Sequence, residues 1–131
     1  MAIEVTSAVL ESLLAEASAA APEECCGLLF GSVTGIMTHQ SAVNVHSTPL
    51  TRFEIDPQVL IDAHRAMRAG GPRLVGYYHS HPAGPPEPSA TDRALAAKDG
   101  MIWAIVGQDR VTLWRAGEEG FQPLPYRLAP A

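Results

Sequence analysis

Hydrophobic side chains recur at intervals of three and four residues near the start of the chain, which is the spacing of an amphipathic helix. They are Val9, Leu10, Leu13, Leu14 and Ala17. Thr6 or Ser7 supplies a hydroxyl that can cap the first turn, and Pro22 stands where a helix must stop. The pattern therefore predicts a helix from about Ser7 to Ala21.

Two further helices are predicted later in the chain. The second begins after Asp56, since Pro57 lies in its first turn and Gly70 follows its last turn. We expect its buried face to be formed by Val59, Leu60, Ala63, His64 and Met67. The third runs from Ser89 to about Asp99 and is closed by Gly100.

Short apolar runs bounded by turn residues predict the strands of a β-sheet. These runs are Cys26–Phe30, Gly35–His46, Arg73–His79, Met101–Val106 and Val111–Arg115. The first two should pair as a hairpin, and so should the last two. Residues Phe53–Ile55 should be extended. The tail, Phe121–Ala131, carries three prolines and is either an edge strand or an irregular strap.

Helices that alternate with strands predict an α/β fold, in which a mixed β-sheet has helices packed against it. The chain has 131 residues, a length that predicts a single domain spanning residues 1–131. Hydrophobic residues make up 47% of the sequence, which suffices for a buried core and is unlike the composition of a disordered chain.

Charge and cysteine content narrow the range of partners and compartments. The formal net charge is −5 and no block of Lys or Arg occurs, so nucleic acid and anionic membranes are not expected as partners. Residues Met1–Val5 lack the basic and apolar regions of a secretory leader. Cys25 and Cys26 are adjacent, which disfavours a disulfide, and we expect two reduced, buried thiols. These features predict a cytoplasmic protein and leave its oligomeric state open.

His79 and His81, with one residue between them, lie on the same side of a strand because side chains alternate with a period of two. Asp92 follows a proline-rich loop, Ala83–Pro88, and can supply an oxygen ligand. Two histidines and a carboxylate leave the fourth tetrahedral position open to water, as in catalytic zinc sites. Iron, manganese or nickel would also accept these ligands. The plain alternative is a pair of ordinary surface histidines.

Asp92 has a second interpretation, because Ser89-Ala90-Thr91-Asp92 fits a capping box. In that arrangement the serine and the aspartate side chains each bond a backbone N–H group at the start of a helix. We favour Asp92 as a metal ligand, because a helix that starts directly after the histidine loop can bring its first turn beside the metal.

In residue types and in spacing, the chain resembles the JAMM/MPN metalloprotease family, whose members remove ubiquitin and ubiquitin-like proteins from conjugates. The family pattern is a glutamate ahead of a strand, His-x-His-Pro, six residues, a serine, two residues and an aspartate. Every spacing is kept here, and the matching residues are Glu24, His79, His81, Pro82, Ser89 and Asp92. The resemblance covers nearly the whole chain and implies the JAMM/MPN fold, which is similar to that of cytidine deaminases.

The resemblance also implies a role for each matching residue. Zn²⁺ would be held by the two histidines and Asp92. Glu24 would be the general base that takes a proton from water and passes it to the leaving amine. Ser89 would stabilise the oxyanion of the transition state. The alternatives are that Glu24 is a solvated carboxylate, as we expect of Glu23, and that Ser89 is only a helix cap, since both uses draw on one hydroxyl.

The function implied by the resemblance is hydrolysis of the peptide or isopeptide bond after the C-terminal Gly-Gly tail of a ubiquitin-like or sulfur-carrier protein. A rival within the enzyme class is the release of cysteine or of a processed tail from a sulfur carrier in sulfur metabolism. A rival from another class is a catalytically silent scaffold of the same fold. Such scaffolds usually lack one or more ligands, whereas this chain keeps the full pattern.

Overall fold

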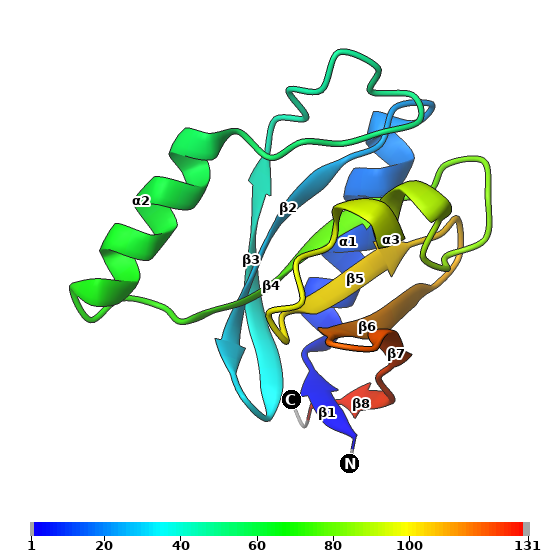
Figure 1. Ribbon diagram of the computed structural model, residues 1–131. Coiled ribbons are helices and arrows are strands. Elements are labelled where there is room, and N and C mark those ends of the chain that lie inside the picture. The colour runs from blue at the N-terminus through cyan, green and yellow to red at the C-terminus, as the bar shows by residue number, and fades with distance from the viewer. Residues whose placement is uncertain (1, 130–131) are drawn as a thin grey trace.

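The computed structural model describes residues 2–129, which form an eight-stranded mixed sheet and three helices (Figure 1). In chain order the elements are β1 (Ile3–Val5), α1 (Ser7–Ala20), β2 (Cys26–Ser32), β3 (Gly35–Ala42), α2 (Pro57–Arg68), β4 (Leu74–Ser80), α3 (Ala90–Leu95), β5 (Ile102–Val106), β6 (Val111–Gly117), β7 (Gly120–Pro123) and β8 (Tyr126–Leu128). Across the sheet the order is β7-β6-β5-β4-β2-β3-β1-β8. Parallel and antiparallel pairs both occur, so the predicted mixed α/β sheet is confirmed.

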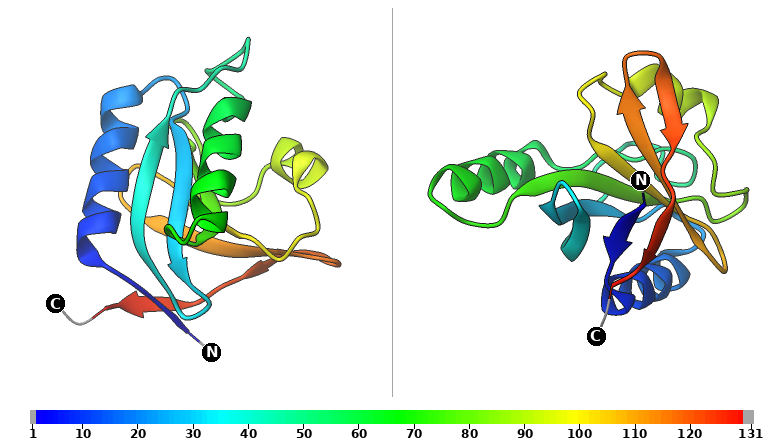
Figure 2. Two further views of the ribbon diagram at one scale, coloured as in Figure 1. Left: turned by 90° about the vertical axis from the view of Figure 1, so that its left-hand side faces the viewer. Right: turned by 90° about the horizontal axis from the view of Figure 1, so that it is seen from below.

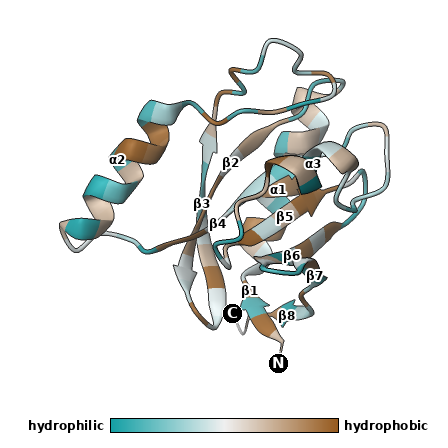
Figure 3. Cartoon of the chain, viewed as in Figure 1, coloured by the Kyte–Doolittle hydropathy of each residue, from teal (hydrophilic) through white to brown (hydrophobic). Residues whose placement is uncertain are grey.

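Helices lie on both faces of this sheet. On one face, α1 contributes Val9 and Leu13 to a buried cluster that includes Leu29 of β2. On the other face, α2 contributes Ala63 to a cluster that includes Leu28 of the same strand. In Figure 2 the two helices flank the β2–β3 hairpin, and in Figure 3 α2 carries both hydrophobic and hydrophilic residues. Because side chains alternate along β2, this strand contributes residues to two separate cores, one on each face of the sheet.

The pairing of β2 with β4 determines where the candidate site forms. The two strands are antiparallel, and Cys26 lies opposite His79. The start of β2 therefore lies beside the end of β4. As a result, the segment that carries Glu24 is brought next to the histidine pair, although the two are far apart in the sequence.

Helix α3 ends at Leu95, so the prediction that it reaches Asp99 is wrong. Ala96 is already extended (φ −66°, ψ 128°), and the Gly100 N–H donates to the Ala116 carbonyl at 2.8 Å. The segment after the helix is therefore held alongside β6, and this tertiary contact outweighs the local helical pattern.

Two other details of the predicted elements are also wrong. Strand β3 ends at Ala42 and does not reach His46, because Asn44 forms an isolated antiparallel bridge with Ile55. On α2, His64 is exposed and only Ala63 of the expected face is fully buried. The helix contacts the sheet along a narrow stripe, and each successive residue lies about 100° further around the helix axis.

The two ends of the described chain meet at one edge of the sheet. β1, which the pattern did not predict, pairs in parallel with both β3 and β8. The tail contains β7 and β8, which confirms the edge-strand alternative for its described part. Pro130 and Ala131 lie outside the described residues. None of the described helices has the length and apolar character needed to span a membrane.

Candidate metal centre and catalytic cleft

His79, His81 and Asp92 converge although they come from two elements. The histidines lie at the end of β4, and Asp92 lies in the first turn of α3. The two histidine Nε2 atoms are 3.1 Å apart. Asp92 Oδ2 lies 3.1 Å from Nε2 of His79 and 3.2 Å from Nε2 of His81. The three side chains thus present one nitrogen or oxygen atom each to a common point.

The spacing of these atoms fits a single tetrahedral metal ion. Zinc bonds of about 2.0–2.1 Å to nitrogen and oxygen place neighbouring ligand atoms about 3.3 Å apart. The observed separations of 3.1–3.2 Å are close to that value. The donor set is also that of a metal site, because imidazole nitrogen and carboxylate oxygen both bind divalent transition metals.

The proline-rich loop fixes the tautomer of His81. Its Nδ1 lies 2.9 Å from the Pro85 carbonyl oxygen, an acceptor, so in the neutral ring Nδ1 carries the proton and Nε2 presents a lone pair to the site. Burial acts to lower the pKa of His81, but hydrogen bonding to Asp92 and to Pro85 outweighs burial and raises it.

His79 is held by aromatic rings. It is 1% exposed and stacks on Phe53, with ring centroids 4.2 Å apart and planes at 15°. Trp103 approaches edge-on at 5.6 Å. Burial lowers the pKa of His79, which favours the neutral imidazole that binds metals. The Nδ1 atom of His79 is buried and has no hydrogen-bond partner.

Asp92 both caps α3 and faces the histidines. The Ser89 N–H donates to Asp92 Oδ2 at 3.0 Å, and the Asp92 N–H donates to Ser89 Oγ at 3.0 Å, so the capping box is present. The two interpretations of this residue are therefore compatible. Burial acts to raise the pKa of Asp92, but hydrogen bonds from His79 and His81 outweigh it and hold the pKa well below its usual range.

Glu24 lines a cleft of about 400 Å³ that also exposes His81 and Ser89. The Glu24 side chain is buried, whereas Glu23 is exposed. Burial raises the pKa of Glu24 to about 7; His81 acts against this shift and Asp92 adds to it. A carboxyl group with a pKa near neutrality can both accept and return a proton.

Ser89 borders the same cleft, at the start of α3. Its oxygen accepts the Asp92 N–H. A serine hydroxyl has one proton to donate besides its two acceptor sites. Capping therefore uses only the acceptor function, and the O–H donor is left for a group in the cleft.

Three residues that the sequence pattern did not single out support the site: Asn44, Phe53 and Ser80. Ser80 lies between the two histidines in the sequence and is buried. Its Oγ accepts the Cys25 N–H at 2.8 Å. Strand alternation alone would place Ser80 on the face away from the histidines. The contacts of Asn44 and Phe53 join distant segments and leave no local signal in the sequence.

The two cysteines take no part in the site. Both are buried and neither forms a disulfide, as expected. Burial raises the pKa of Cys25 to about 11 and that of Cys26 to about 12, so both thiols stay protonated near neutral pH. A protonated, buried thiol is a poor nucleophile and a poor metal ligand.

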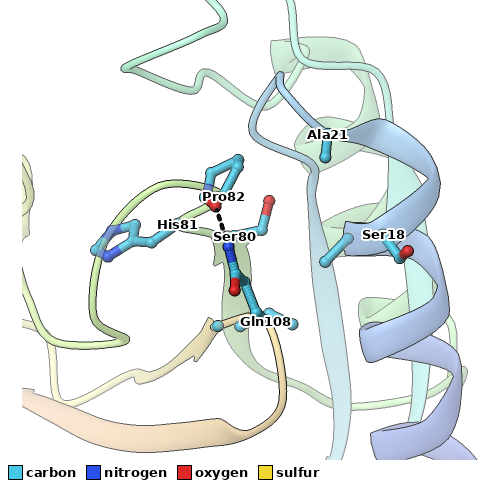
Figure 4. Close-up of a pocket in the computed structure, with 9 residues that line it drawn as sticks. Ser18, Ala21, Ser80, His81, Pro82 and Gln108 are labelled. Carbon is cyan, nitrogen blue, oxygen red and sulfur yellow. Dashed lines mark hydrogen bonds between the residues drawn. The ribbon is translucent and has the colours of Figure 1, made fainter.

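A second hollow, of about 250 Å³, lies beside His81 and is bordered by Ser18 of α1 and by Ala21, which follows that helix (Figure 4). The Gln108 side-chain N–H donates to the Pro82 carbonyl at 3.1 Å and braces the turn that follows the histidines. In Figure 4 the His81 ring points away from this hollow. The His81 ring therefore faces the other cleft, the one that Glu24 lines.

Comparison with known sequences places the chain in a family. Residues 6–117 match the family described as prokaryotic homologues of the JAB domain. A desampylase from Haloferax volcanii is 32% identical over 111 residues, which are 83% of this chain and 80% of that protein. A probable TtuB-protein conjugate cleaving protease from Thermus thermophilus is 36% identical over 109 residues, which are 82% of this chain and 71% of that protein.

Solved structures agree with this placement. The solution structure of a protein from Desulfitobacterium hafniense superposes with a TM-score of 0.82 at 28% identity, covering 98% of this chain and 94% of that one. A JAB1/MPN domain protein from Archaeoglobus fulgidus superposes with a TM-score of 0.63 at 19% identity, covering 96% and 98%. The second similarity shows a shared fold.

The relatives, the JAB1/MPN fold and the convergence of His79, His81 and Asp92 together indicate a JAMM-type peptidase or isopeptidase. The chain belongs to the family of prokaryotic homologues of the JAB domain. The resemblance read from the sequence is therefore confirmed.

Proposed function

We propose that this protein is a zinc-dependent peptidase or isopeptidase that cleaves after the C-terminal Gly-Gly tail of a ubiquitin-like or sulfur-carrier protein. The observation that carries the proposal is that the ligand atoms of His79, His81 and Asp92 lie 3.1–3.2 Å from one another. Glu24 lines the cleft that His81 also lines. The substrate class is supported by the relatives, which are named a desampylase and a TtuB-protein conjugate cleaving protease.

In this proposal the two histidines and Asp92 hold zinc. When bound, zinc supplies Lewis-acid chemistry, which makes water nucleophilic near neutral pH and polarises a carbonyl group. Glu24 takes the proton from the attacking water as the water oxygen bonds to the scissile carbonyl carbon. Glu24 then gives that proton to the amine as the carbon–nitrogen bond breaks. Its buried position and its pKa of about 7 support both transfers.

Ser89 is proposed to donate its O–H to the carbonyl oxygen as negative charge develops there. The geometry supports this role, because the Ser89 oxygen only accepts in the capping box and keeps its donor. A donor aimed at the developing charge stabilises the transition state more than the ground state.

The substrate tail is proposed to lie extended along the cleft. One side of the cleft is formed by Leu50 and Thr51, and the other by the proline-rich loop. A Gly-Gly tail suits a narrow passage because it has no side chains. Val43 (73% exposed) and Leu50 (57% exposed) offer apolar surface to the folded body of a ubiquitin-like protein. Main-chain pairing along an extended tail would add affinity.

The test compares two substrates side by side: a full-length ubiquitin-like or sulfur-carrier fusion, and a short peptide with the same terminal residues. We expect cleavage directly after Gly-Gly in the fusion and much weaker cleavage of the peptide. A chelator should abolish both reactions, and added zinc should restore them. Equal rates on the two substrates would instead describe a general peptidase, and no cleavage by the zinc-loaded protein would favour the scaffold alternative.

A further inference from the structure

Residues 44–54, here called the Asn44 loop, are closed by the Val45 N–H, which donates to the Glu54 carbonyl at 3.0 Å, and by the side chain of Asn44. The Asn44 amide donates to the Arg52 carbonyl at 3.0 Å, and its oxygen accepts the N–H groups of His46 and Glu54, both at 3.1 Å. Its second donor bond goes outside the loop, to the Glu24 carbonyl at 3.0 Å. An asparagine amide has two N–H donors and two acceptor positions, so its bonding capacity is fully used.

The same loop holds the backbone of Glu24 on both sides. The Glu24 N–H donates to the Pro49 carbonyl at 2.8 Å, and the Glu24 carbonyl accepts from Asn44. Both polar backbone groups of Glu24 are therefore bonded to the Asn44 loop. The direction of its carboxyl group depends on how that loop is closed.

The far end of the loop reaches the metal centre. Phe53 stacks on His79 at 4.2 Å, with ring planes at 15°. Metal-binding histidines usually donate their second N–H to an acceptor that orients the ring. In His79 that atom, Nδ1, is buried without a hydrogen-bond partner. The Phe53 ring therefore takes over the orienting function that an acceptor usually has.

We propose that the Asn44 loop is a clamp that positions the proposed base and one metal ligand together. Asn44 is the positioning residue for Glu24, and Phe53 is the positioning residue for His79. This inference rests on the proposed function for the role of Glu24. The contact between Phe53 and His79 bears on metal affinity whatever the substrate is.

The Asn44 part of the clamp is tested with Asn44→Asp, which keeps the size and the acceptor oxygens but removes both N–H donors. We expect kcat to fall by about 10²-fold, a loss that a displacement of about 1 Å can cause. KM should change far less, and zinc content should stay at one ion per chain. Ser47→Ala, in the same loop but exposed and outside these contacts, is the matched control and should keep wild-type kcat.

The Phe53 part is tested without any substrate, by chelator competition for zinc. Phe53→Leu should weaken zinc affinity about 10- to 100-fold, the range seen when partners that orient metal ligands are lost. Its cobalt-substituted form should show a shifted visible spectrum. Phe53→Tyr keeps the flat ring and should retain both the affinity and the spectrum. Unchanged zinc affinity in Phe53→Leu would overturn this half of the proposal.

The wild-type protein offers a test that needs no variant. The amide protons of Glu24 and Glu54 should be protected from hydrogen exchange, since each donates into the clamp. Rapid exchange at both would overturn the clamp even if Asn44→Asp failed to fold. A folded Asn44→Asp variant with wild-type kcat would also overturn the clamp. If the wild type cleaves no conjugate, the proposed function fails, while the exchange and zinc measurements still decide the clamp.

Discussion

Glu24 shows at the scale of one residue how position creates reactivity. Its carboxyl group is buried, and burial raises its pKa to about 7, from the usual value of 4.5. Glu23, its neighbour in the chain, points to solvent. Two chemically identical side chains therefore have different environments, and only one of them lines the cleft.

Replacing Glu24 by glutamine should remove hydrolysis and leave the metal in place. The amide keeps the size of the side chain but cannot accept the proton, and general acid–base catalysis contributes typically about 10²–10⁴-fold. We expect kcat to fall within that range, with one zinc per chain by elemental analysis. The control is Glu23→Gln, which should behave as wild type. The reverse result would mean that Glu23 is the base.

The raised pKa of Glu24 also predicts how the stability of the metal-free protein depends on pH. Between pH 4.5 and about 7 the folded state keeps a proton on Glu24 that the unfolded chain has lost, so the contribution of Glu24 to stability falls as the pH rises through this window. Each pKa unit corresponds to about 1.4 kcal/mol, so the loss from this shift is at most about 3.5 kcal/mol.

Glu24→Gln removes this ionisation and isolates its effect. In urea unfolding with a chelator present, wild type and variant should differ little at pH 4. At pH 8 the variant should be the more stable of the two. An equal difference at both pH values would show that the folded protein does not raise the pKa of Glu24.

At the scale of elements, the start of α3 joins a helix cap to the metal centre. The capping box between Ser89 and Asp92 fixes the first turn of the helix and so directs the Asp92 carboxylate toward β4. A helix of six residues has little stability of its own, and its position depends on this cap and on the histidines that Asp92 contacts.

Two substitutions of Ser89 should separate the cap from the proposed oxyanion role. Ser89→Ala should lower the free energy of unfolding by about 1 kcal/mol, whereas Ser89→Gly should lower it by only a few tenths, because glycine is tolerated at an N-cap. Both lack the hydroxyl, and both should lose about 10²–10³-fold in kcat. Urea unfolding and steady-state kinetics measure the two effects. Near-normal kcat in Ser89→Gly would leave Ser89 as a cap only.

At the scale of the whole molecule, the candidate metal centre joins parts of the chain that only folding brings together. His79 and His81 end β4, and Asp92 belongs to α3. An unfolded chain does not hold these three groups at 3.1–3.2 Å. Zinc should therefore bind the folded state and stabilise it by mass action.

Thermal and urea unfolding should reflect this linkage. Free zinc at about one hundred times its dissociation constant should stabilise the wild type by about 2.7 kcal/mol, and a chelator should reverse the effect. His81→Ala should unfold at the same denaturant concentration with and without zinc, and it should carry sharply less metal. A wild-type protein whose stability does not change with zinc would contradict the ligand assignment.

The cytoplasmic location stays a prediction.

The sequence by itself determined whatever depends on neighbours in the chain. Helical spacing placed α1 and α2, a hydroxyl of Thr6 or Ser7 and the carboxylate of Asp56 were the expected caps, and strand alternation put His79 and His81 on one face. The spacing of the JAMM pattern selected Glu24, Ser89 and Asp92 as site residues. The helices and the strand alternation are confirmed because caps and periodicity are local properties of the chain, whereas the roles of the site residues stay predictions.

Only the tertiary structure decided what depends on contacts between distant segments. The pairing of Gly100 with Ala116 ended α3 early, and the bridge between Asn44 and Ile55 ended β3. No local pattern brings Phe53 against His79, buries Glu24 or points the amide of Asn44 at its carbonyl. Burial and cross-chain hydrogen bonding arise from packing, and packing raises the pKa of Glu24 and orients His79.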